Sequence, residues 1–113
     1  MEGKEYRGRT PIALPALTQL VNYALLRETV EFSDHCCGHM RERKFSAAGV
    51  LLVLATGDHS GVPRWNERNQ NFAYHVTGRD FDGNRLKVIY SLEEVGNLLR
   101  VISAQRYHQG VKV

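Results

Sequence analysis

Hydrophobic and polar residues alternate along the C-terminal half of the chain, between Asn71 and Arg106. This period of two, rich in β-branched and aromatic residues, predicts antiparallel strands on both sides of the turn-forming sequence Asp82-Gly83-Asn84. A two-residue loop would mix polar and apolar side chains on each face, whereas a three-residue loop separates them and is therefore favoured. The apolar face then carries Phe72, Tyr74, Val76, Leu86, Val88 and Tyr90, and the polar face carries Ala73, His75, Thr77, Arg79, Arg85, Lys87, Ile89 and Ser91.

A further strand is expected from about Leu98 to Arg106, where the alternation continues. It predicts two faces, one with Leu99, Val101 and Ser103, and the other with Leu98, Arg100, Ile102, Ala104 and Arg106. We expect Arg100 and the rest of its set on the same side of the sheet as His75.

Apolar residues recur with a helical period before these strands. Pro15 and the N-cap residues Ser33 and Ser46 mark three helix starts. The three helices are expected over residues 15–27, 34–44 and 46–57, with a short β-like run at 29–32. The third is the most apolar and should be the most buried. Residues 58–70 are rich in turn formers and predict a mobile connection that could include a short edge strand.

The chain has 113 residues, the size of one domain, and we expect a single domain over residues 1–113. Residues 1–12 form a loose tail, 13–57 a helical half and 62–107 a sheet half. The predicted fold class is α+β, with the N-terminal helices packed on one face of a three- to four-stranded antiparallel sheet.

Composition and charge narrow the function classes. The chain is 42% hydrophobic and 24% charged, and it contains no apolar run of the roughly 20 residues that a membrane helix needs. Without a signal-peptide pattern, and with two adjacent cysteines that are poorly placed for a structural disulfide, a cytoplasmic protein is predicted. The net charge of +3 arises after residue 61, where 8 Lys and Arg face 5 Asp and Glu. This bias fits nucleic acid or an acidic protein as partner.

The polar face of the sheet carries the most suggestive chemistry. His75 would lie there beside Lys87 and Arg100, as metal-free cleavage of an RNA phosphodiester requires: one group that titrates near neutral pH and fixed cations that stabilise the transition state. The alternative is an ordinary half-solvated antiparallel sheet. Arg43 could clamp a phosphate from the end of the second helix, or cap its negative pole. Additional candidates at the end of the last strand are Arg106, Tyr107 and His108, which could supply an acid or stack on a base, or could be the frayed end of the domain.

Metal chemistry is the weaker hypothesis. His35 and His39 lie four residues apart with Cys36 between them, which is compatible with zinc, but zinc needs three or four ligands and Gly38 would loosen this helix. We therefore expect no metal and no cofactor. His35 is then a polar residue of the first helical turn, and Cys36 a small buried one.

Two blocks of the sequence resemble a bacterial family. Residues 33–57 contain Ser33-Asp34-His35-Cys36, Met40-Arg41-Glu42-Arg43, Phe45-Ser46, Val50, Leu54 and Gly57, which is similar to the S-x-H-A-x(3)-M-x-E-R-x-I-S…V…L…G pattern of domain of unknown function family 4258. Residues 74–88 resemble the strand, G-x-D, hairpin and strand that follow in this family. The close of the chain, LRVISAQR at 99–106, resembles instead the L/I-R-I-I-S-A-R end of BrnT-type ribonuclease toxins.

Both families resemble the RelE-like group of small bacterial toxins, in which an open sheet face cuts RNA without a metal. The resemblance supports His35 and Arg43 as motif positions, and Arg100, Ser103 and Arg106 in the closing strand. It implies a toxin-like, metal-independent endoribonuclease of a toxin-antitoxin system, with RNA as substrate and an antitoxin protein as partner. The predicted catalytic residues are His75, Lys87, Arg100, Arg43 and Arg106, and the predicted substrate-binding residues are His35, Arg79, Arg85, Ser103 and Tyr107. The alternative is a non-catalytic module that binds RNA or protein through the same basic face, and a metal-binding regulator is a distant third.

Overall fold

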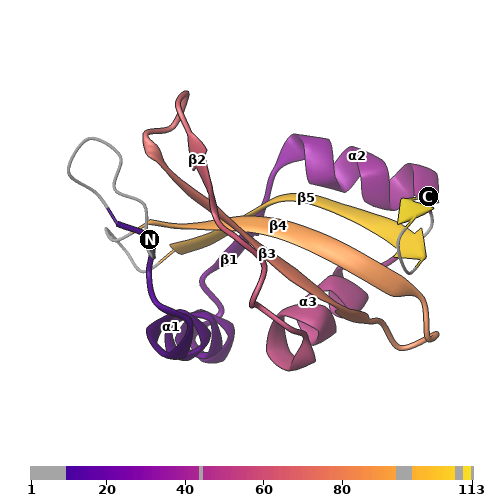
Figure 1. Cartoon of the computed structure of the whole chain (residues 1–113). Helices are drawn as coiled ribbons and strands as arrows, with labels where there is room; N and C mark the ends of the chain where they lie inside the picture. The colour runs from indigo at the N-terminus through magenta and orange to yellow at the C-terminus, as the bar shows by residue number, and fades with distance from the viewer. Residues whose placement is uncertain (1–9, 44, 94–97, 109–110, 113) are drawn as a thin grey trace.

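The computed structural model of the protein describes residues 10–43, 45–93, 98–108 and 111–112. Most of the predicted N-terminal tail lies outside these ranges. The elements, in chain order, are α1 (Leu14–Arg27), β1 (Val30–Phe32), α2 (Asp34–Arg43), α3 (Ala47–Thr56), β2 (Arg64–Asn66), β3 (Asn71–Arg79), β4 (Arg85–Glu93), β5 (Leu98–His108) and β6 (Val111–Lys112) (Figure 1). None of the described helices is long and apolar enough to cross a membrane.

The strands form one sheet in the order β1-β5-β4-β3-β2, with β6 paired to β5. Strands β2 to β5 pair antiparallel, but β1 runs parallel to β5. The α+β class is thus confirmed, while the expected purely antiparallel sheet of three to four strands is a mixed sheet with more strands. Parallel neighbours need a long crossover between them, and here everything from α2 to β4 supplies it.

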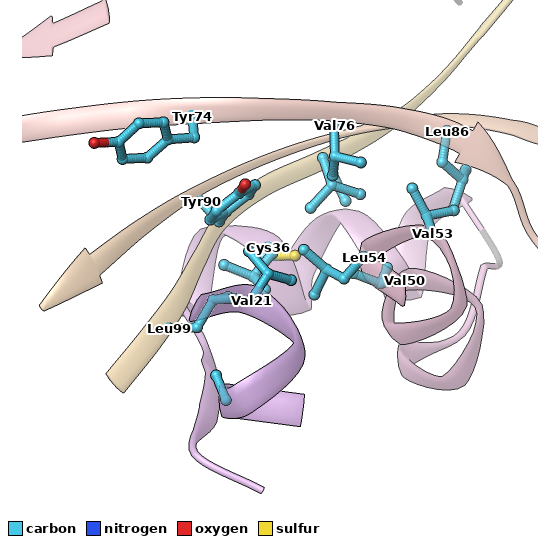
Figure 2. Close-up of a cluster of buried hydrophobic side chains, with 14 of the residues drawn as sticks. Val21, Cys36, Val50, Val53, Leu54, Tyr74, Val76, Leu86, Tyr90 and Leu99 are labelled. Atoms are coloured by element: carbon cyan, nitrogen blue, oxygen red, sulfur yellow. The ribbon is translucent and has the colours of Figure 1, made fainter. Parts of the chain in front are cut away.

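The core lies between the sheet and the three helices (Figure 2). Helix α3 contributes the most buried positions of any described helix, as predicted from its apolar sequence. Its N-terminus is capped by Ser46, whose hydroxyl accepts a hydrogen bond from the Gly49 N–H at 3.0 Å. The buried apolar side chains of β3 and β4 are those of the predicted face, namely Phe72, Tyr74, Val76, Leu86, Val88 and Tyr90.

The β3–β4 hairpin keeps this predicted face with a longer loop. Tyr74 pairs with Tyr90 and the last pair is Arg79 with Arg85, so the connection is residues 80–84 rather than three residues. Two extra residues leave the parity of the pairing unchanged, so every side chain stays on its expected face. Asp80 organises the longer turn, because its carboxylate accepts the backbone N–H groups of Asp82 at 3.0 Å and Asn84 at 2.8 Å.

A β-bulge in β5 overturns part of the prediction for this strand. Ile89 pairs with Ser103, but the next residue of β4, Tyr90, pairs with Val101, so Ile102 is the extra residue. Beyond the bulge the faces are exchanged. Ala104 is buried on the helix side, and Ser103 turns to the side of His75. The assignments of Ala104, Ser103 and Arg106 to their faces were therefore wrong, since simple alternation cannot register an inserted residue.

Ser33 ties α2 to this bulge. Its N–H donates to the carbonyl of Val101 at 2.9 Å, and its hydroxyl donates to the carbonyl of Ile102 at 2.8 Å. The same hydroxyl accepts the N–H of Cys36 at 3.1 Å and so caps the helix. One side chain thus satisfies both the helix start and the carbonyl that the bulge removes from the strand pairing.

Candidate nucleic-acid interface: the outer face of the sheet

We call the side of β3, β4 and β5 that faces away from the helices the outer face. Its described positions are Asn71, Ala73, His75, Thr77, Arg79, Arg85, Lys87, Ile89, Ser91, Glu93, Leu98, Arg100, Ser103 and Gln105. His75, Ile89 and Ser103 form one row across the three strands, and Thr77, Lys87 and Gln105 form the next. The half-buried side chains of His75 and Lys87 are diagonal neighbours, about 7 Å apart by the geometry of paired strands. The structure thus brings these two predicted residues together.

Arg100 lies on the outer face as predicted, but carboxylates already bind its guanidinium. The Arg100 Nη2 and Nε atoms lie 2.8 and 2.9 Å from Glu31 Oε1, and Nη1 lies 3.7 Å from Glu93 Oε2. Glu31 is its direct cross-strand partner, because β1 runs parallel to β5. The strand of Arg100 is also separated by β4 from the strand of His75. Arg100 is therefore poorly placed to clamp a phosphate at His75.

A stronger basic group lies at the hairpin end of the outer face. Arg79 and Arg85 are directly opposed across β3 and β4, and Lys87 follows two residues further along β4, about 6.6 Å away along the strand. Within the described parts of the chain, none of the three forms an ion pair with a carboxylate. Arg79 Nη1 donates to the carbonyl of Gly83 at 2.9 Å, which orients this guanidinium. We call Arg79, Arg85 and Lys87 the hairpin cluster.

The remaining predicted residues lie elsewhere. Arg106 pairs with Leu86, whose side chain is in the core, so the bulge directs Arg106 to the helix side rather than to the side of His75. Its Nε atom is buried and has no hydrogen-bond partner in the described structure. Ser103 is on the outer face, in the row of His75. The side chains of Arg43 and Tyr107 fall outside the described residues, although their backbones end α2 and continue β5.

His35 lies on α2, on the helix side of the sheet, and is exposed. Its ring centroid is 4.3 Å from that of His39. No group of three or more His, Cys, Asp or Glu side chains suited to a metal ion occurs within the described ranges. Cys36 is buried in the core, as expected, and burial raises the pKa of its thiol to about 11. The His35–His39 pair is separate from the outer face and contributes nothing to a site at His75.

A buried histidine that sequence analysis missed lies just after α3. His59 is 6% exposed, with Nε2 3.0 Å from the carbonyl oxygen of Leu54 and Nδ1 2.7 Å from the hydroxyl of Tyr90. Because a carbonyl only accepts, Nε2 carries the proton and Nδ1 accepts the tyrosine hydroxyl. Burial lowers the pKa of His59 and raises that of Tyr90. The surrounding turn formers indicated a mobile connection, and no local signal marks His59 as a core residue.

The model of a domain of unknown function (DUF4258) matches residues 32–106. The chain belongs to the DUF4258 family. No curated protein and no solved structure matches it.

Several residues that carry the DUF4258 resemblance support the fold. Ser33 caps α2 and holds the bulge, and Asp80 holds the hairpin turn. Gly57 and Gly78 let the end of α3 approach β3 closely: a Cβ on Gly57 would lie 2.6 Å from the Thr77 carbonyl oxygen, and one on Gly78 would lie 3.2 Å from the Gly57 Cα. The roles of these four residues in this chain are therefore explained by packing and hydrogen bonding within the fold.

Proposed function

We propose that this DUF4258 protein binds RNA through the outer face of its sheet, with the hairpin cluster as the phosphate-binding element. The observation that carries the proposal is the direct pairing of Arg79 with Arg85. Like charges directly opposite one another destabilise a sheet, and no described carboxylate lies within ion-pair distance of either guanidinium. A bound phosphate would relieve the repulsion.

The chemistry of the cluster suits an RNA backbone. A guanidinium has five N–H donors and can hold a phosphate through two of them at once. Arg79 uses one nitrogen for the Gly83 carbonyl, which leaves the others available and limits the conformational entropy lost on binding. Lys87 adds a third cation on the same face, so successive phosphates of one strand can be neutralised together.

The opposite end of the outer face is less favourable for RNA. There Glu31 and Glu93 surround Arg100 and cancel its charge. The described outer-face cations that form no ion pair thus lie at the hairpin end, which predicts where the RNA backbone lies.

Binding of a short labelled single-stranded RNA, followed by fluorescence anisotropy against salt, tests the proposal. An Arg79→Gln/Arg85→Gln variant should bind more weakly, and the slope of log K against log salt should become shallower by about 1.4, since each phosphate contact to a single strand contributes about 0.7. Arg41→Gln, an exposed arginine on α2, is the control and should match the wild type. If the double variant keeps the wild-type affinity and slope, the hairpin cluster does not bind RNA.

A second function, RNA cleavage, is favoured by the placement of His75 beside Lys87. We propose that the neutral imidazole of His75 takes the proton of a ribose 2′-hydroxyl, whose oxygen attacks the adjacent phosphorus. Lys87 stabilises the charge that develops on the phosphate oxygens, and the bond to the 5′-oxygen breaks. The imidazolium returns its proton to that oxygen, leaving a 2′,3′-cyclic phosphate and a free 5′-hydroxyl. With this activity the protein would be a toxin-like, metal-independent endoribonuclease, and the BrnT-like end of the chain suggests an antitoxin as partner.

Cleavage is tested by incubating single-stranded RNA with the protein in EDTA and analysing the ends of the products. His75→Gln should lower the rate by about 10²- to 10⁴-fold with little change in RNA affinity. His35→Gln changes an exposed histidine on the helix side and should cleave like the wild type. RNA that stays intact with the wild-type protein would overturn the cleavage proposal while leaving the binding proposal to its own test.

A further inference from the structure

Phe81 is the most exposed aromatic residue in the hairpin. The residue is 71% exposed, although burial of a phenylalanine ring is favourable. It occupies the turn between β3 and β4, two residues after Arg79 and four before Arg85. An exposed aromatic residue thus lies in the turn that joins the paired arginines of the hairpin cluster.

Hydrogen bonds within the turn hold the backbone around Phe81, so its exposure does not come from an unconstrained loop. The Asp80 N–H donates to the Asn84 carbonyl at 3.0 Å, and the Gly83 N–H donates to the Asp80 carbonyl at 3.1 Å. The Asp80 carboxylate, only 8% exposed as a residue, accepts two further backbone N–H groups of the turn. These bonds fix the backbone on both sides of Phe81, so the ring cannot reach the core without breaking them.

We propose that Phe81 stacks on an unpaired base while the hairpin cluster holds the adjacent phosphates, so that the ligand of the outer face is single-stranded RNA. This inference rests on the proposed RNA binding and adds the strandedness of the ligand and the residue that selects it. Every base offers a π-face, so stacking is tolerant of sequence. In a duplex the bases are already stacked on one another and are closed to an aromatic side chain. Asp80 and Asp82 flank Phe81 in the chain, but the Asp80 carboxylate is bound to the backbone N–H groups of the turn. The two arginines paired at the base of the turn favour a nucleic acid over an apolar protein surface as the partner of this ring.

The test compares Phe81→Ala and Phe81→Leu with the wild type. Loss of one base–aromatic stack should weaken binding of single-stranded RNA by about 5- to 150-fold, equivalent to about 1–3 kcal/mol. Phe81→Leu keeps an apolar side chain without a π-face and should lose nearly as much. The salt slope should stay at the wild-type value in both variants, since no phosphate contact is removed. Binding of an oligomer of abasic sugar phosphate should be equal in wild type and variants.

A gain-of-signal variant completes the test. Phe81→Trp, made together with Trp65→Phe to remove the background, should retain binding, and its emission should be quenched when a base stacks on the indole. Thermal unfolding of Phe81→Ala should match the wild type, because the ring is exposed.

Different results would refute base stacking by Phe81 and RNA binding by the hairpin cluster. If Phe81→Ala binds single-stranded RNA as tightly as the wild type while the Arg79/Arg85 double variant binds more weakly, stacking is refuted and RNA binding stands. If single-stranded and double-stranded RNA lose equal affinity in Phe81→Ala, the strandedness inference is refuted. If neither variant changes RNA binding, the proposed function itself is wrong.

Discussion

Replacing Tyr90 by phenylalanine removes one hydroxyl from the interior of the protein and leaves the ring in place. Tyr90 is fully buried, and its hydroxyl is the donor to Nδ1 of His59 at 2.7 Å. In Tyr90→Phe this nitrogen keeps its burial and loses its donor, while Nε2 stays bonded to the Leu54 carbonyl. A buried polar atom without a partner costs about 1–3 kcal/mol, and we expect the free energy of unfolding to fall by that amount.

Urea denaturation followed by circular dichroism measures this change. Tyr23→Phe is the matched control, because Tyr23 is an exposed residue of α1 with a side chain 42% exposed. Removing its hydroxyl should change the free energy of unfolding by less than about 0.5 kcal/mol. Equal stability of the two variants would refute the role assigned to the His59–Tyr90 pair.

The same pair predicts a pH dependence whose sign follows from burial. Burial lowers the pKa of His59 in the folded protein below its ordinary value of 6.5. As the pH falls through about 6.5, the unfolded chain binds a proton at His59 and the folded protein does not, so stability decreases by up to about 1.4 kcal/mol per pH unit until the folded pKa is reached. Above pH 6.5 this contribution is constant. His59→Gln cannot titrate, so it should lose less stability than the wild type between pH 6.5 and 5, and parallel pH curves for the two proteins would contradict the assignment.

Three further predictions concern the stability of the fold and the reactivity of its two cysteines. Ser33→Ala removes both the N-cap of α2 and the hydrogen bond to the Ile102 carbonyl in the bulge. In urea denaturation it should lower the free energy of unfolding by about 1–3 kcal/mol, and a smaller loss would count against this double role. Gly57→Ala places a methyl group 2.6 Å from two carbonyl oxygens and should destabilise by at least about 1–3 kcal/mol, whereas Gly38→Ala, with open space around it in a helix, should stabilise by about 0.5–1 kcal/mol. At pH 8 the half-buried Cys37 should react with a thiol reagent in the native protein, and Cys36, which is buried and has its pKa raised to about 11, should react only after denaturation.

Local sequence signals account for most of the elements. The helical periods, the N-caps at Ser33 and Ser46 and the stop at Gly57 placed the three helices to within a residue or two of their observed bounds. The alternation in β3 and β4 placed their buried faces correctly, and with them the shared outer face of His75 and Lys87. These features depend on neighbours along the chain, which is why a single sequence carries them.

Features that join distant segments were decided only by the tertiary structure. The bulge at Ile102 is bound by the hydroxyl of Ser33, which is 69 residues away along the chain, and it moves Arg106 off the outer face. The parallel pairing of β1 with β5 brings Glu31 to Arg100 and neutralises it. His59 becomes a core residue because Tyr90 and a helix carbonyl lie beside it.

The sequence by itself therefore determined which residues are apolar, where helices begin and end, and which side of each hairpin strand is buried, because side-chain direction alternates with every residue. It did not determine which charges meet across the sheet. That depends on strand order, on parallel or antiparallel direction and on one inserted residue in β5, and each of these is selected by packing and hydrogen bonding of the whole domain rather than by any local stretch.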